Sequence, residues 1–130
     1  MKNHHGGMVL LKGFLFGFND GGGLTCLELK TGRVAWRNRS VGKGAVVYAD
    51  GHIYLRSEGG RVALVEAGTS EYVQKGVFAQ PQRSGRPAWP HPVVADGKLF
   101  LATRTRCWPT TSRASSGPLG FSRTFESPPR

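Results

Sequence analysis

A glycine-turn unit recurs along the first hundred residues and limits the folds open to this chain more than any other feature. The three copies are LKGFLFGFNDGG from Leu11, ADGHIYLRSEGG from Ala49 and ADGKLFLATR from Ala95. Their turn glycines, Gly13, Gly51 and Gly97, lie 38 and 46 residues apart. A period of about 40–50 residues, with about four short strands in each unit, is typical of β-propeller blades.

The residues between these turns predict short strands. We expect them at 7–11, 14–18, 24–29 and 34–39, at 45–48, 52–56, 62–66 and 72–78, and at 92–95 and 98–101. The pairs Asp50-Gly51 and Asp96-Gly97 predict tight hairpins, because both central positions of such a turn favour positive φ. Apolar runs such as VALV, which do not alternate with polar residues, predict strands that are covered on both faces. The 19 glycines and the many β-branched and aromatic residues argue against helices.

We therefore expect an all-β chain that forms a partial β-propeller over residues 1–101. It would comprise about two four-stranded antiparallel blades plus half of a third. Propellers close with about four to eight blades. A chain of this length would therefore leave apolar blade faces without partners, and we expect the remaining blades of a larger parent, or another protein, to cover them.

The segment CLELKTGRVAW resembles the repeat of the pyrroloquinoline-quinone-like (PQQ-like) β-propeller family, whose pattern is A-x-D-x-x-T-G-K-x-x-W. Thr31, Gly32 and Trp36 match this pattern outright, and Arg33 replaces the lysine. Cys26 stands at the alanine position and Glu28 at the aspartate position. The second unit, VALVEAGTSEYVQKG, departs from the pattern because it lacks the T-G-K-x-x-W part.

The resemblance implies two kinds of function. Some members are quinoprotein dehydrogenases that bind PQQ and Ca²⁺ and carry an adjacent Cys-Cys pair, whereas others are cofactor-free scaffolds in outer-membrane assembly. The two cysteines of this chain, Cys26 and Cys107, are far apart in the sequence. We therefore expect a non-catalytic binding or scaffold module without a cofactor. The alternative is part of a PQQ-dependent alcohol or sugar dehydrogenase. The resemblance places a full-length parent in the periplasm or cell envelope.

No motif in the sequence predicts a catalytic or metal site. His4 and His5 are neighbours, and neighbours on a strand point to opposite faces, so they cannot easily share one ion. The acidic residues Asp20, Asp50, Glu58 and Asp96 fall in or beside turns, where we expect them to stabilise loops. The sequence shows no signal peptide and no run long enough to span a membrane.

The composition changes at residue 102. The net charge of the chain is +10, which raises the alternative of a nucleic-acid-binding protein. Residues 102–130 hold +4 of this charge and the rest is spread singly, without interleaved aromatic residues, so we do not favour that alternative. We expect 102–130 to be a disordered tail. We also hypothesise that it is a frameshift product, because LATRTRCWPT can encode RDQDAVLAYY when each codon starts one base early, and that string would continue the blade.

Overall fold

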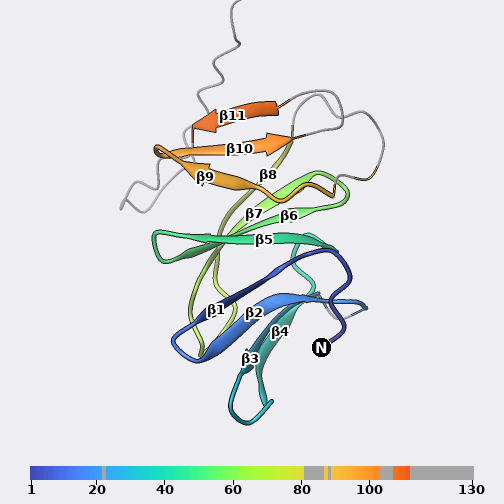
Figure 1. Cartoon of the computed structure of the whole chain (residues 1–130), viewed down its shortest axis with the longest axis vertical. Coiled ribbons are helices and arrows are strands. Elements are labelled where there is room, and N and C mark those ends of the chain that lie inside the picture. The colour runs from blue at the N-terminus through green and yellow to red at the C-terminus, as the bar shows by residue number, and fades with distance from the viewer. Residues whose placement is uncertain (22, 81–86, 88, 103–106, 112–130) are drawn as a thin grey trace, which may run out of the picture.

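The computed structural model consists of three antiparallel sheets stacked along the long axis of the molecule (Figure 1). It describes residues 1–21, 23–80, 87, 89–102 and 107–111, the last of these by backbone alone. These residues contain strands and turns and no helix. The expected all-β fold of a partial propeller is confirmed.

Each four-stranded sheet follows the chain from its first strand to its fourth. The first sheet contains β1 (Met8–Leu11), β2 (Phe14–Asn19), β3 (Gly23–Glu28) and β4 (Val34–Asn38). The second contains β5 (Gly44–Ala49), β6 (His52–Ser57), β7 (Arg61–Glu66) and β8 (Gln74–Ala79). The third contains β9 (Val93–Ala95), β10 (Lys98–Ala102) and β11 (Cys107–Thr111), in the order β11-β10-β9.

The hairpins form where two-residue turns interrupt the apolar runs. Asp50 and Gly51 take φ values of 48° and 75° between β5 and β6, and Asp96 and Gly97 take 49° and 65° between β9 and β10. Positive φ at both central residues gives a turn whose twist matches that of the flanking strands. Asp tolerates this conformation better than most residues, and Gly adopts it freely.

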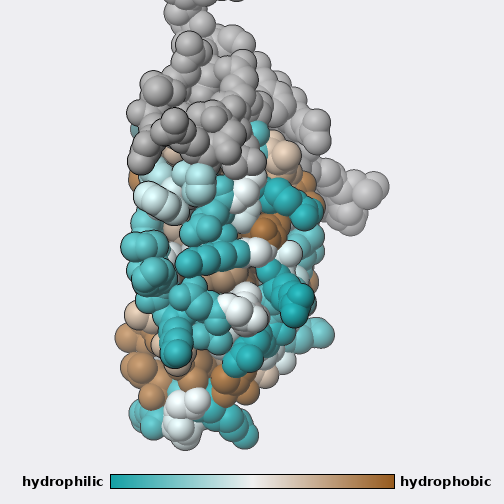
Figure 2. Space-filling view, turned by 90° about the vertical axis from the view of Figure 1, so that its right-hand side faces the viewer, coloured by the Kyte–Doolittle hydropathy of each residue, from teal (hydrophilic) through white to brown (hydrophobic). Residues whose placement is uncertain are grey.

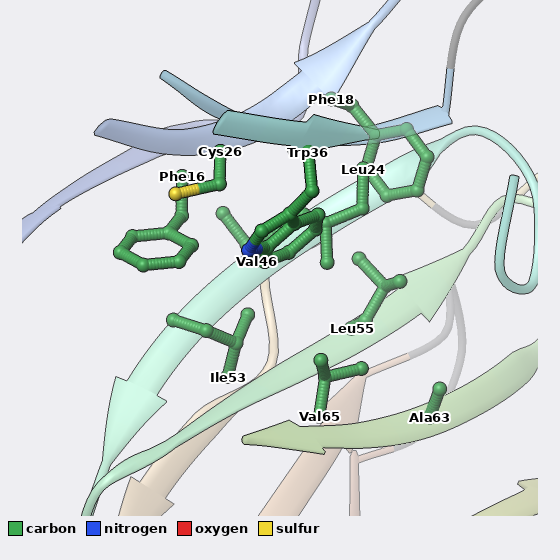
Figure 3. Close-up of a cluster of buried hydrophobic side chains, with 10 residues drawn as sticks. All are labelled: Phe16, Phe18, Leu24, Cys26, Trp36, Val46, Ile53, Leu55, Ala63 and Val65. Carbon is green, nitrogen blue, oxygen red and sulfur yellow. The ribbon is translucent and has the colours of Figure 1, made fainter. Parts of the chain in front are cut away.

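The sheets pack face to face through two apolar clusters. Phe16, Phe18, Leu24 and Cys26 of the first sheet meet Ile53, Leu55, Ala63 and Val65 of the second (Figure 3). The other face of the second sheet presents Tyr54, Val62 and Leu64 to Leu99 and Leu101 of the third. Successive residues of β6 and β7 thus enter different clusters, which explains why these strands do not alternate apolar and polar residues.

The third sheet extends beyond the expected boundary at Leu101. β10 continues to Ala102, and β11 pairs with it in a register that joins Ala102 to Cys107. Part of the segment expected to be a tail therefore forms a strand. The expectation of disorder for residues 103–106 and 112–130 falls on residues that lie outside the described ones.

Candidate functional site

The residues of the repeat motif come together on the β3–β4 hairpin. The Gly32 N–H donates to the Glu28 carbonyl at 2.9 Å, and the Glu28 N–H donates to the Arg33 carbonyl at 2.9 Å. The Thr31 hydroxyl donates to Glu28 Oε2 at 2.5 Å and accepts from the Arg33 N–H at 3.2 Å. Gly32 takes a φ of 73°. Thr and Gly at these positions therefore build the turn, and the Glu28 carboxylate fixes the threonine side chain.

Trp36 connects the first sheet to the second. Its side chain points into the cluster between the sheets and is only 9% exposed. The indole lies 5.9 Å from the Phe16 ring and 5.7 Å, edge-on, from the Tyr72 ring. Its Nε1–H donates to the Gly68 carbonyl at 3.0 Å. A large side chain with one donor suits this position, because the ring fills the core while the N–H holds a backbone segment of the next blade.

Cys26 lies beside Trp36 in the same cluster and is fully buried. Burial raises the pKa of the thiol to about 11, because the apolar surroundings disfavour the thiolate. The thiolate is the form that attacks electrophiles and binds metals. Cys26 is therefore a core residue here. The other predicted motif residues, the Asp50-Gly51 and Asp96-Gly97 turns, lie on separate hairpins and do not form one site with the β3–β4 hairpin.

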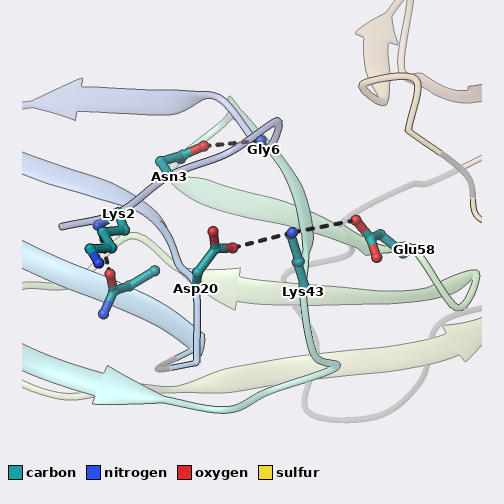
Figure 4. Close-up of polar contacts among 7 residues, drawn as sticks. Lys2, Asn3, Gly6, Asp20, Lys43 and Glu58 are labelled. Atoms are coloured by element: carbon teal, nitrogen blue, oxygen red, sulfur yellow. Dashed lines mark hydrogen bonds and ion pairs between the residues drawn. The ribbon is translucent and has the colours of Figure 1, made fainter.

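A group of charged side chains holds the first two sheets together at one end. Lys43 Nζ lies 3.3 Å from Asp20 Oδ1 and 4.0 Å from Glu58 Oε1 (Figure 4). Asp20 follows β2 and Glu58 follows β6, so one lysine joins equivalent turns of two blades. The expectation that these two carboxylates stabilise loops agrees with this arrangement. A surface pair of this kind contributes about 0–1 kcal/mol.

Arg56 forms a buried polar contact that sequence reasoning missed. It is 1% exposed and donates through Nε and Nη2 to Gln80 Oε1 at 3.2 and 2.7 Å, and through Nη1 to the Pro90 carbonyl at 3.0 Å. Gln80 Nε2 has no hydrogen-bond partner among the described residues. The sequence signal that could have indicated it is an arginine directly after the apolar run IYL of a predicted strand. Arg56 thus connects Gln80, just after β8, with Pro90, shortly before β9.

The described residues offer little chemistry beyond this packing. They contain no group of three or more His, Cys, Asp or Glu side chains placed to hold a metal ion. His4 and His5 lie in a bend before β1, with their rings tilted by 36° and the centroids 4.4 Å apart, so the expectation that they point to opposite faces of a strand is wrong. His91 contacts the backbone carbonyl of His5 at 3.0 Å. A shallow hollow of about 10 Å³ lies beside His5, Lys43, Glu58 and Trp89. That is room for roughly one water molecule, whereas typical ligand pockets hold about 300–1,000 Å³.

Comparisons with known proteins give one family. Residues 2–74 match the family model described as outer membrane protein assembly factor BamB, a model of PQQ-like repeats. A search of curated proteins finds no match to the chain. Within the part of the chain that the structure describes, no helix has the length and hydropathy needed to cross a membrane.

Proposed function

The chain belongs to the PQQ-like repeat family of outer membrane protein assembly factor BamB, and on that basis we propose that it is a non-catalytic section of a β-propeller. In this role it acts as a binding or scaffold module within a larger parent. The remaining blades of that parent cover its free faces, and protein partners bind the assembled propeller. The family description names an outer-membrane assembly factor, and we extend this to a cell-envelope location for the parent.

The observation that carries the proposal is the free face of the first sheet. Val9 and Leu11 pack toward the second sheet, so Met8 and Leu10 lie on the opposite face, where they are 54% and 58% exposed. Counted from the turn glycines, Met8 corresponds to Val46 of the second sheet, which is 4% exposed because the first sheet covers it. Figure 2 shows apolar side chains gathered at the lower end of the molecule, where the first sheet lies.

Met8 therefore occupies a position that the second sheet buries against its neighbour, whereas Leu10 corresponds to Tyr48, which is also exposed in the second sheet. Leaving large apolar side chains exposed costs about 25 cal/mol for each Å² that a neighbour would cover. A preceding blade, packed as the first sheet packs on the second, is the partner that fits this face. The arrangement supports a section of a longer propeller.

The position of β11 supports the reading-frame hypothesis. The shifted string would place Arg at position 102 and Val-Leu-Ala-Tyr-Tyr at 107–111, where the backbone of β11 pairs with β10. Arg at 102 would also correspond to Arg56, counted from Gly97 and Gly51. We therefore propose that residues 102–130 are translated out of frame and have no function of their own.

Sequencing the encoding DNA across Leu101 and downstream tests the proposal. The expected result is a shifted frame that stays open and encodes further repeats with T-G-K-x-x-W segments. A closed frame would contradict it. The absence of catalysis is tested on the parent expressed in the restored frame. Added PQQ and Ca²⁺ should produce neither a spectral shift nor dye-linked oxidation of alcohols and sugars, and activity would instead identify a quinoprotein dehydrogenase.

A further inference from the structure

The outer strand of the first blade has a free edge. β4 is the last strand in the order β1-β2-β3-β4, and among the described strands it forms its hydrogen-bonded ladder with β3 alone. In such a strand, every second residue directs its N–H and C=O away from the sheet. The edge can therefore form a further ladder of main-chain hydrogen bonds with an extended segment.

This edge is strongly and uniformly basic. Between Glu28 and Asp50 the sequence contains five cationic residues and no acidic one. Four of them are exposed and have no ion-pair partner among the described residues: Lys30, Arg33, Arg37 and Arg39. We call these four residues, together with the edge of β4, the basic edge. The fifth, Lys43, is paired with Asp20.

The outer strand of the second blade gives the comparison. β8 is also the last strand of its sheet, and among the described strands it pairs with β7 alone. Its one cationic side chain, Lys75, is paired with Glu66 at 2.7 Å. Of the two four-stranded sheets, only the first therefore combines a free strand edge with a cluster of unpaired cations.

We propose that the basic edge binds an acidic, extended segment of a partner protein, which adds to the first blade as a fifth strand. Main-chain hydrogen bonds to β4 supply affinity, and the alternating side chains of the added strand supply specificity. Arg37 is exposed on the strand at the edge of the sheet, so a carboxylate of the added strand can reach it. Arginine forms bidentate hydrogen bonds with carboxylates, which favours Glu or Asp over neutral residues.

Charge also argues against the other occupants of this edge. A second copy of the chain pairing through its own β4 would bring two basic edges together, and like charges across a strand pair are destabilising. Single-stranded nucleic acid is bound mainly by aromatic side chains on which the bases stack, together with a basic groove. The aromatic residue of β4, Trp36, is buried and cannot stack on a base.

The inference rests on the proposed scaffold role and specifies the chemistry of the partner that the scaffold binds.

The test uses the full chain and a fluorescent peptide of alternating glutamate and valine, with binding measured by anisotropy. We expect saturable binding. The triple variant Arg33→Gln, Arg37→Gln, Arg39→Gln should weaken it about 10-fold, since each exposed ion pair contributes about a two-fold effect. The control variant Lys2→Gln, Lys12→Gln, Lys98→Gln removes the same charge from exposed sites elsewhere and should change the affinity by less than about two-fold. Circular dichroism checks that both variants fold.

A second peptide separates strand addition from charge attraction alone. N-methylation of alternate residues removes the main-chain donors that would face β4 and leaves the glutamates in place, so binding should fall to the background level. Equal binding of the methylated peptide, an equal loss in the control variant, or tighter binding of a single-stranded oligonucleotide at the same arginines would overturn the inference. The DNA sequence across Leu101 does not affect this assay, so the inference and the proposed function can fail separately.

Discussion

Replacing Trp36 is expected to separate the first blade from the second. The Trp36→Ala substitution removes a side chain that is 9% exposed, together with its contacts to Phe16 and Tyr72 and its hydrogen bond to the Gly68 carbonyl. Truncating a buried tryptophan costs about 3–5 kcal/mol. Domains of this size are stable by about 5–15 kcal/mol in total, so this variant falls close to the unfolding threshold.

Trp36→Phe gives a milder and more informative change. Phenylalanine keeps most of the apolar contact but cannot donate to Gly68, so we expect a loss of about 1–2 kcal/mol. Urea unfolding followed by far-ultraviolet circular dichroism should show the midpoint falling by about 1 M. Fluorescence is unsuitable here because the substitution removes an emitting side chain.

Trp89→Ala is the matched control. Trp89 is 54% exposed and its ring lies 6.0 Å from that of His5, so its loss should cost less than about 0.5 kcal/mol. If Trp36→Phe and Trp89→Ala shift the urea midpoint equally, the indole of Trp36 does not hold the two blades together and the reasoning is refuted.

Three further predictions concern the interior. Gly44→Ala would place its Cβ 1.8 Å from the Arg56 carbonyl oxygen and should destabilise the chain by about 3 kcal/mol or more in urea unfolding. Gly59→Ala is the control, because its Cβ would meet no atom closer than 3.6 Å, and its free energy of unfolding should be nearly unchanged. Gln80→Glu replaces the unpartnered Nε2 with a charged acceptor for Arg56 and should raise stability near neutral pH by about 1 kcal/mol, a gain that disappears in acid as the carboxylate is protonated. Because burial raises the pKa of Cys26 to about 11 from an ordinary value of 9.0, its contribution to stability is complete below about pH 9 and is lost as the pH rises toward 11. The urea midpoint should fall over that range, and a Cys26→Ala variant should show a smaller fall.

The features that the sequence predicted correctly are local ones. The Asp50-Gly51 turn and its neighbouring strands follow from adjacent residues, because a two-residue turn sets the register of the hairpin. The coverage of both faces of the second sheet was visible as apolar runs without alternation. Positions counted from the turn glycine of each repeat then indicate which residues lie on the sheet face that packs against a neighbouring blade.

The features that the sequence could not predict depend on distant pairs. The partner of Trp36 is a backbone carbonyl 32 residues away, and that of Arg56 is a side chain 24 residues away, so no local spacing marks either contact. β11 escaped prediction for a different reason. Its sequence, CWPTT, includes Pro109, which is uncommon in strands except at an edge such as this one. The basic edge needed the topology as well, because only the order of the described strands shows that none of them pairs with the outer side of β4.

The 32-residue separation between Trp36 and Gly68 also determines when the first blade can be completed during synthesis. The hairpins of this blade close among neighbours and can form as soon as they leave the ribosome, because contacts at short sequence separation form quickly. The indole of Trp36 stays exposed to solvent on the side that faces the second blade until the segment around Gly68 and Tyr72 has emerged. It then gains its hydrogen bond to Gly68 and its ring contact with Tyr72. The first blade therefore waits for the second, and a chaperone that shields one exposed sheet face would be matched to this order of folding.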